Sequence, residues 1–192
     1  MLVQSAIHDA FLAALAKRVA GLRVGHGTAD GTTFGPLINR AGVAKVARHV
    51  TDALGKGATL VTGGGALAGS GGHFFAPTVL TGCGPGMLCF DEETFGPVVS
   101  VVKFGTEAEA VALANKSSVG LAGYLCTADL GRAWRVAGDL EVGMVGINEG
   151  AISTEVAPFG GIKMSGLGRE GGAVGMDEYL NTKYICMGGL AE

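Results

Sequence analysis

Charged side chains are scarce in this chain, since Asp, Glu, Lys and Arg make up 16% of its 192 residues. The formal net charge is −3, so there is no basic surplus that would attract a nucleic-acid backbone. Long apolar runs are also missing, and no stretch approaches the roughly 20 residues that cross a bilayer. Nucleic acid and membrane are therefore excluded from the partners that we expect for this chain.

Cysteine is represented by Cys83, Cys89, Cys126 and Cys186 only. No two of them form a C-x-x-C pair, and no histidine stands at metal-ligand spacing from any of them. We therefore expect four reduced, mostly buried thiols, and neither a metal site nor a disulfide framework.

The first 22 residues show no sign of a targeting segment. They are amphipathic and carry both signs of charge, unlike a signal or transit peptide. The expected location is the cytoplasm, and a mitochondrial location stays compatible if the N-terminus is truncated.

Hydrophobic residues, by contrast, make up 48% of the chain, which is enough to build a core and argues against disorder. Glycine is unusually frequent, with 35 residues and no collagen-like period. That frequency predicts many tight loops between short elements.

Helical and strand-like patterns alternate along the sequence. Helical spacing of apolar residues predicts helices over residues 7–22, 43–54, 106–116, 129–140 and 174–180. Short apolar or alternating runs predict strands over residues 58–62, 74–80, 97–104, 121–127, 143–148 and 182–188. Thr106 and Glu109 form a capping box at the start of the third helix. The alternation indicates an α/β fold with a mostly parallel sheet flanked by helices.

The glycine-rich stretch near the C-terminus contains a literal G-x-G-x-x-G at Gly166, Gly168 and Gly171. A dinucleotide-binding loop of this kind joins a strand to a helix. The residues before it, "PFGGIKMS", contain a proline and two glycines and are not typical of a central strand. We therefore interpret the stretch as a loop whose glycines allow close approach and positive φ, and not as a phosphate cradle.

Longer motifs give this stretch a different context. The segment "PFGGIKMSGLGRE" (158–170) resembles the C-terminal signature of the aldehyde dehydrogenase superfamily, and "EETFGPVV" (92–99) resembles that family's nicotinamide-side motif. The segments "NEGAIST" (148–154) and "DEYLNTKYICMGGL" (177–190) are most similar to its succinate-semialdehyde dehydrogenase branch. The resemblance covers the chain almost end to end, with the motifs in family order.

The resemblance implies two cofactor-binding and two substrate-binding positions. Glu93 matches a carboxylate that accepts hydrogen bonds from the nicotinamide ribose hydroxyls, and Phe95 matches an aromatic near the nicotinamide ring. Ser153 matches a hydroxyl that holds the substrate carboxylate, and Phe159 matches an aromatic that lines the aldehyde channel. The residues alone leave alternatives open: a solvated acidic run for Glu93, core packing for both phenylalanines, and a local loop contact for Ser153.

The family fold that the resemblance implies has an N-terminal Rossmann-like cofactor domain, an α/β catalytic domain and a small oligomerisation element. This chain resembles only the second half, so we expect residues 1–176 to be a portion of the catalytic domain and residues 177–192 an oligomerisation tail. The implied cofactor is NAD or NADP, and the implied substrate is a small-molecule aldehyde that carries a carboxylate. The family's nucleophilic cysteine, general-base glutamate and oxyanion-hole asparagine all precede the region that matches Met1, so no catalytic residue is expected here.

Three functions follow from these expectations. The first is the C-terminal part of an NAD(P)-dependent aldehyde dehydrogenase, inactive by itself. The second is a non-catalytic interaction module that associates with itself or with a full-length subunit through the C-terminal strand. The third is a small enzyme built around Cys89, which we disfavour because no basic neighbour in the sequence would stabilise its thiolate. Without a partner domain, the first helix and the sheet edge are expected to expose apolar faces and to lower solubility.

Overall fold

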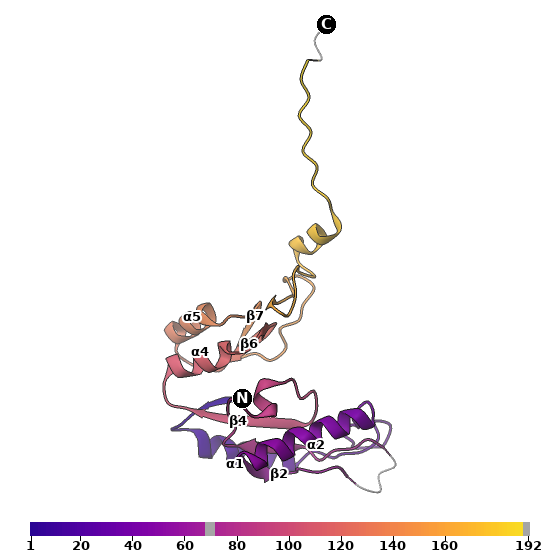
Figure 1. Cartoon of the computed structure of the whole chain (residues 1–192), viewed down its shortest axis with the longest axis vertical. Coiled ribbons are helices and arrows are strands. Elements are labelled where there is room, and N and C mark those ends of the chain that lie inside the picture. The colour runs from indigo at the N-terminus through magenta and orange to yellow at the C-terminus, as the bar shows by residue number, and fades with distance from the viewer. Residues whose placement is uncertain (68–71, 190–192) are drawn as a thin grey trace. The chain divides into compact units, whose positions relative to one another are not determined.

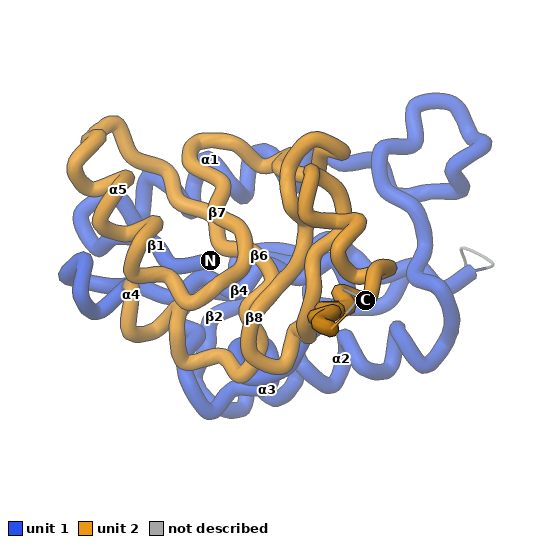
Figure 2. The backbone as a smooth tube through the Cα atoms, turned by 90° about the horizontal axis from the view of Figure 1, so that it is seen from above, with its two compact units in different colours: residues 1–110 blue, residues 111–192 orange. Residues whose placement is uncertain are grey.

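The structure is a computed structural model that describes residues 1–67 and 72–189. The chain forms two compact units, residues 1–110 and residues 111–192, which Figure 2 shows in different colours. Both units combine helices with short strands, as the ribbon in Figure 1 shows. The expected α/β class is confirmed.

The first unit is built on a four-stranded sheet. Its strands are β1 (Leu2–Gln4), β2 (Thr59–Thr62), β3 (Thr78–Thr81) and β4 (Val98–Phe104), in the order β1-β4-β3-β2. The central strand β4 is parallel to both β1 and β3, whereas β2 is antiparallel to β3. The sheet is therefore mixed, with parallel pairing at its centre. Strand β2 lies at the edge of the sheet, and its Leu60 is 39% exposed.

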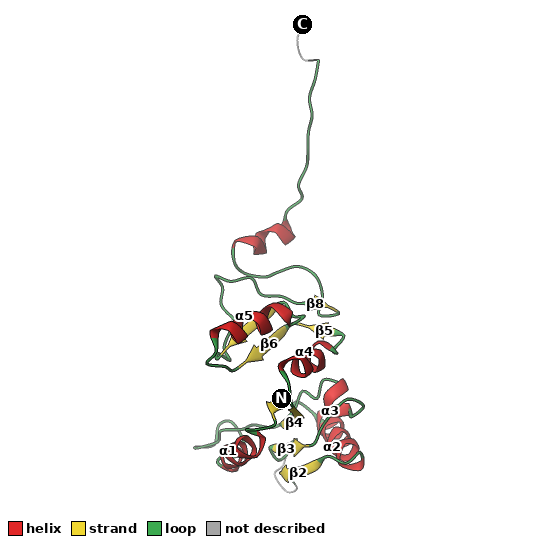
Figure 3. Cartoon of the chain, turned by 90° about the vertical axis from the view of Figure 1, so that its left-hand side faces the viewer, coloured by secondary structure: helices red, strands yellow, loops and turns green. Residues whose placement is uncertain are grey.

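Helices cover both faces of this sheet, as Figure 3 shows. They are α1 (His8–Ala20), α2 (Arg40–Gly55) and the short α3 (Leu88–Asp91). The apolar side chains of α1 pack on a buried cluster of Val3, Val79 and Val101. The expectation that this helix would expose its apolar face holds in part, because this cluster leaves the middle of the face partly buried, while Ile7 and Leu22 at its ends are 57% and 37% exposed.

The second unit contains two small strand pairs. Strand β6 (Ala122–Leu125) runs parallel to β7 (Met144–Ile147), and the helix α5 (Leu130–Asp139) connects them. Strand β5 (Val119–Gly120) pairs antiparallel with β8 (Ile162–Lys163), and a 3₁₀ helix follows at Ala173–Tyr179. Asp129 caps α5 by accepting a hydrogen bond from the Arg132 N–H at 2.9 Å, as expected for an aspartate at this position.

The helix α4 (Glu107–Asn115) carries the cap that the sequence predicts. Thr106 Oγ1 accepts a hydrogen bond from the Glu109 N–H at 3.2 Å. The Glu109 carboxylate returns to the N–H of Gly105 at 2.8 Å, one residue earlier than in the usual capping box. The box is therefore confirmed, with its return bond shifted by one residue.

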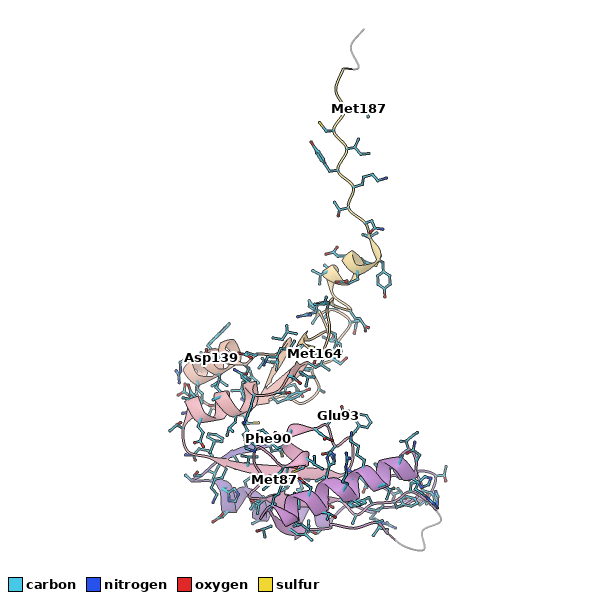
Figure 4. The ribbon with its side chains drawn as sticks, in the orientation of Figure 1. Met87, Phe90, Glu93, Asp139, Met164 and Met187 are labelled. Atoms are coloured by element: carbon cyan, nitrogen blue, oxygen red, sulfur yellow. The ribbon has the colours of Figure 1, made fainter. Side chains whose placement is uncertain are left out.

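The C-terminal segment is extended and exposed over residues 181–189, as Figures 1 and 4 show, with Met187 near its end. Within the described part of this single chain the segment pairs with no strand. A strand over residues 182–188 that joins a second subunit stays a prediction. The limit between residues 176 and 177 also stays a prediction, since the boundary of the compact units lies between residues 110 and 111.

The four cysteines are free thiols. Cys83 is buried and Cys89 is half-buried, but Cys126 and Cys186 are exposed, so the expectation of mostly buried thiols is wrong for these last two. Cys126 follows a short strand at the surface and Cys186 lies in the extended tail. In residues 1–67 and 72–189, no helix is both long enough and apolar enough to cross a membrane.

Replacing Leu80 by alanine is expected to destabilise the first unit strongly. Leu80 is fully buried, and a Leu→Ala change in a core costs about 2–5 kcal/mol. The matched control is Leu60→Ala, because Leu60 pairs directly with Leu80 across β2 and β3 but is 39% exposed. We expect urea unfolding followed by circular dichroism to show less than about half the loss for the control. Equal losses would contradict the difference in burial between the central and the edge strand.

Candidate cofactor and substrate site

The segment from Glu92 to Pro97 leaves α3 and lies along α2, and alternate residues of it contact that helix. Glu92 Oε2 lies 3.3 Å from Arg48 Nη2 and 3.3 Å from His49 Nε2. The Thr94 hydroxyl lies 3.1 Å from His49 Nδ1, at hydrogen-bond distance. Two side chains of the segment therefore dock on one turn of α2.

His49 is the buried part of this docking contact, with a side chain that is 0% exposed. Its Nδ1 has Thr94 as a hydrogen-bond partner. Its Nε2 lies within ion-pair distance of Glu92, but the geometry is not that of a hydrogen bond. We therefore assign the docking mainly to the Thr94 contact, since a buried hydrogen bond is costly to leave unmade.

Gly96 continues the alternation, because it lies directly against α2. A Cβ at this position would come 2.4 Å from Val46 Cγ2, and Val46 is fully buried. Any larger residue would therefore push the segment away from the helix. Glu92, Thr94 and Gly96 thus face α2 one after another.

Glu93 and Phe95 stand at the intervening positions and are exposed. Phe95 is 82% exposed and has a φ of 44°, a backbone conformation that costs on the order of 1–3 kcal/mol for a non-glycine residue. Core packing, one of the alternatives for Phe95, is therefore wrong. Figure 4 shows Glu93 on the loop that follows Phe90.

The acidic run before Phe95 is not simply solvated, because its three carboxylates differ in their contacts. Asp91 accepts a hydrogen bond from the Gly86 N–H at 2.8 Å, and Glu92 contacts α2. Glu93 presents its carboxylate at the surface. The exposed carboxylate can accept hydrogen bonds, and the exposed ring two residues later can pack against a flat group.

In the second unit, Ser153 lies on the loop that follows β7. Asn148 anchors the start of this loop: its amide accepts from the Thr127 N–H at 2.9 Å and donates to the Thr127 carbonyl at 2.8 Å. The Glu149 carboxylate accepts hydrogen bonds from the N–H groups of Ala151 and Gly150, and these bonds lower the pKa of Glu149. Ser153 follows this ordered turn and is exposed.

Phe159 lies on the following strand-like segment and is half-buried. Its backbone exchanges two hydrogen bonds with Glu170, at 2.7 and 2.8 Å. Arg169 Nη1 donates to the carbonyls of Gly161 and Gly168, both at 2.8 Å. These bonds fold the stretch from Pro158 to Glu170 back on itself beside Phe159.

The conformations of the glycines agree with this loop geometry. Gly166, Gly168 and Gly171 all have positive φ, at 107°, 81° and 67°. The stretch follows the two-residue strand β8 and leads into a 3₁₀ helix, so it does not join a strand to an α-helix as a dinucleotide loop does. Our interpretation of the G-x-G-x-x-G as a shaped loop is confirmed in its conformation.

The predicted site residues fall on two segments, one in each unit. Glu93 and Phe95 share one segment of the first unit, while Ser153 and Phe159 lie on neighbouring loops of the second. Among residues 1–67 and 72–189, no three His, Cys, Asp or Glu side chains group as a metal site would require.

Sequence reasoning missed His49 and the contact between Cys83 and Cys89. His49 stands in the apolar stripe of α2, three residues after Val46, and a polar residue in such a stripe was an available signal. Interaction with Cys83 is the largest cause that lowers the pKa of Cys89 to about 6. Cys83 follows β3 and Cys89 lies in α3, and their spacing in the sequence carries no recognised signal for a pair.

Comparison with known proteins places these features in a family. The aldehyde dehydrogenase family profile matches residues 1–185. The mitochondrial succinate-semialdehyde dehydrogenase of Rattus norvegicus is 58% identical over 190 residues, which is 98% of this chain and 36% of that protein. This chain therefore spans about a third of the length of the curated relatives that it matches.

Solved structures show the same relationship. The crystal structure of succinate-semialdehyde dehydrogenase from Burkholderia pseudomallei matches with a TM-score of 0.93 and 55% identity, over 97% of this chain and 38% of that one. Betaine aldehyde dehydrogenase from Staphylococcus aureus, in complex with NAD⁺, matches with a TM-score of 0.91 and 43% identity, over 96% and 37%. Sequence and fold agree from residue 1 to the tail, and the chain belongs to the aldehyde dehydrogenase family.

Proposed function

We propose that this chain forms the C-terminal part of an NAD(P)-dependent succinate-semialdehyde dehydrogenase, which oxidises succinate semialdehyde to succinate. The observation that carries the proposal is the identity of 58% to the rat enzyme over 98% of the chain. The docked segment from Glu92 to Pro97 supports it, because the exposed carboxylate and ring suit a cofactor rather than a core.

In this proposal the first unit contributes to cofactor binding. The NAD(P)⁺ that these residues would hold would supply the hydride acceptor for the oxidation. The Glu93 carboxylate accepts hydrogen bonds from the two ribose hydroxyls, and the Phe95 ring packs near the nicotinamide. Both roles require the docking on α2, since His49 and Gly96 fix the backbone on either side of these residues.

The second unit contributes a wall of the substrate pocket. The exposed Ser153 hydroxyl donates a hydrogen bond to the carboxylate of the semialdehyde. Phe159, half-buried on the return loop, lines the aldehyde channel. The extended tail within residues 177–192 pairs with a neighbouring subunit, and residues 1–176 form the portion of the catalytic domain. The exposed backbone of the tail supports its pairing with a neighbouring subunit, because unpaired N–H and C=O groups favour strand addition.

The second candidate function is an interaction module without catalysis, and the exposed tail favours it. Tyr184, Ile185 and Met187 are 86%, 68% and 69% exposed. Large apolar side chains that are exposed close together are typical of a surface that binds another protein. In this case the chain would join full-length dehydrogenase subunits and alter their assembly. Co-purification with an intact dehydrogenase, lost when residues 181–192 are deleted, would favour this function over the first.

The purified 192-residue chain is expected to produce no reduced cofactor from succinate semialdehyde with NAD⁺ or NADP⁺. The reason is that the family's thiol, base and oxyanion donor lie outside these residues, and losing them together removes covalent catalysis. Activity is expected when the N-terminal portion of the Burkholderia relative is fused before Met1. Turnover by the chain alone, in material free of host enzyme, would contradict the proposal.

In the same fusion, Glu93→Gln is expected to raise KM for the cofactor by about 10- to 100-fold, the cost of a lost charged hydrogen bond. KM for the semialdehyde should change little, because Glu93 contacts the ribose only. The control is Asp30→Asn, which neutralises another exposed carboxylate of the first unit. An unchanged cofactor KM in the Glu93 variant would remove this residue from the site.

Thr94→Val is expected to loosen the segment around Glu93 in the chain by itself. The change leaves His49 Nδ1 buried without a partner, which costs about 1–3 kcal/mol and raises local amide exchange roughly 5- to 100-fold. Arg48→Ala, the control, removes only the half-exposed ion pair, worth at most about 1 kcal/mol. Hydrogen exchange read by mass spectrometry over residues 92–97 measures both, and equal effects would refute the assigned importance of His49.

A further inference from the structure

Two cysteine residues of the first unit converge beside the middle of β4. The Cys83 N–H donates a hydrogen bond to the Val101 carbonyl at 3.2 Å. The Cys89 carbonyl accepts one from the Ser100 hydroxyl at 3.4 Å. Adjacent residues of one strand thus hold both cysteines at the same place on β4, and each thiol is the largest influence on the pKa of the other. The fold therefore makes a thiol pair from residues whose spacing, C-x₅-C, is not a recognised redox motif.

The loop between the two cysteines is anchored to the end of α2. Asp52 Oδ2 accepts a hydrogen bond from the Leu88 N–H at 2.8 Å. Lys56 Nζ donates to the Gly86 carbonyl at 2.6 Å, and Asp91 Oδ2 accepts from the Gly86 N–H at 2.8 Å. These three bonds fix the loop on both sides of its centre. The two cysteines are therefore held near each other by the folded unit.

The two thiols are chemically unequal. Interaction with Cys83 is the largest cause that lowers the pKa of Cys89 to about 6, and a hydrogen bond from Ser100 adds to it. The same interaction, together with burial, raises the pKa of Cys83, which is 6% exposed. Burial favours the same assignment, because a negative charge is costlier on the buried Cys83 than on the half-buried Cys89. A reactive thiolate next to a protected second thiol is the arrangement of peroxide-sensing cysteine pairs.

We propose that Cys83 and Cys89 form a peroxide-sensitive dithiol that closes to an intramolecular disulfide. The Cys89 thiolate attacks one oxygen of a hydroperoxide; the O–O bond breaks, and the leaving oxygen departs as water or alcohol after taking up a proton. Cys89 is then a sulfenic acid. The Cys83 sulfur attacks the Cys89 sulfur as its own proton leaves, the S–O bond breaks and water departs. The two thiols are oxidised and the peroxide is reduced.

The test uses the 192-residue chain as it stands, treated with hydrogen peroxide at pH 7 and quenched with acid. Remaining thiols are alkylated, and the chain is digested with pepsin, which cuts between the cysteines at Leu88 under conditions that stop thiol exchange. We expect the Cys83 and Cys89 fragments to stay linked until a reductant is added. Linkage of Cys89 to Cys126 or Cys186, or two alkylated thiols while Cys126 and Cys186 are oxidised, would overturn the proposal.

Single variants separate the two roles. In Cys83→Ser, Cys89 is expected to stop at the sulfenic acid, which dimedone traps. In Cys89→Ser, Cys83 should stay unmodified, because it is buried and protonated at neutral pH. Equal dimedone labelling of the two variants would contradict the assignment of Cys89 as the attacking sulfur.

A folding control uses the Cys126→Ser/Cys186→Ser background, in which only the pair is left. At pH 7 the thiolate fraction of Cys89 is close to complete, against a few per cent for an ordinary thiol. Disulfide formation in buffer should therefore be about tenfold faster than in urea. Because thiolate is lost as pH falls through about 6, alkylation of Cys89 by iodoacetamide should decline there. Equal rates in buffer and urea, or a decline only near pH 8, would overturn the proposal.

Discussion

The docking of residues 92–97 on α2 is the constraint on which the candidate cofactor site depends. The buried contact between His49 and Thr94 and the close approach of Gly96 to Val46 fix every second residue of the segment. The residues between them are thereby turned to the surface. An exposed phenylalanine with positive φ would be an unfavourable arrangement in a free loop, and here the two neighbouring contacts hold it in place.

The same short part of the chain also contains the thiol pair. Cys89 belongs to α3, which leads directly into the docked segment, and α2 anchors both through Asp52, Lys56 and His49. His49 and Asp52 of α2 and its C-cap residue Lys56 follow one another at roughly one turn, so one face of the helix supports the loop before α3 and the segment after it. A change in the oxidation state of Cys83 and Cys89 would therefore act on α3, which contains Cys89 and directly precedes the docked segment with Glu93.

In the second unit, hydrogen bonds between side chains and the backbone order the loops that carry Ser153 and Phe159. Asn148 and Glu149 order the loop that carries Ser153, and Arg169 ties down the glycine-rich return beside Phe159. None of these side chains was predicted to bind a ligand. They act through backbone N–H and C=O groups, which must be paired when they are taken from water.

The sequence by itself determined the α/β class, most of the helices and strands and the family, because periodicity, capping residues and long motifs are local properties of the chain. It also marked Glu93, Phe95, Ser153 and Phe159, through motifs alone. Tertiary structure decided that β2 is an edge strand, that α1 packs on the cluster of Val3, Val79 and Val101, that His49 contacts Thr94, and that Cys83 and Cys89 both lie beside β4. These contacts join residues on different elements, so their distances depend on how the sheet and helices assemble, and no spacing along the chain encodes them.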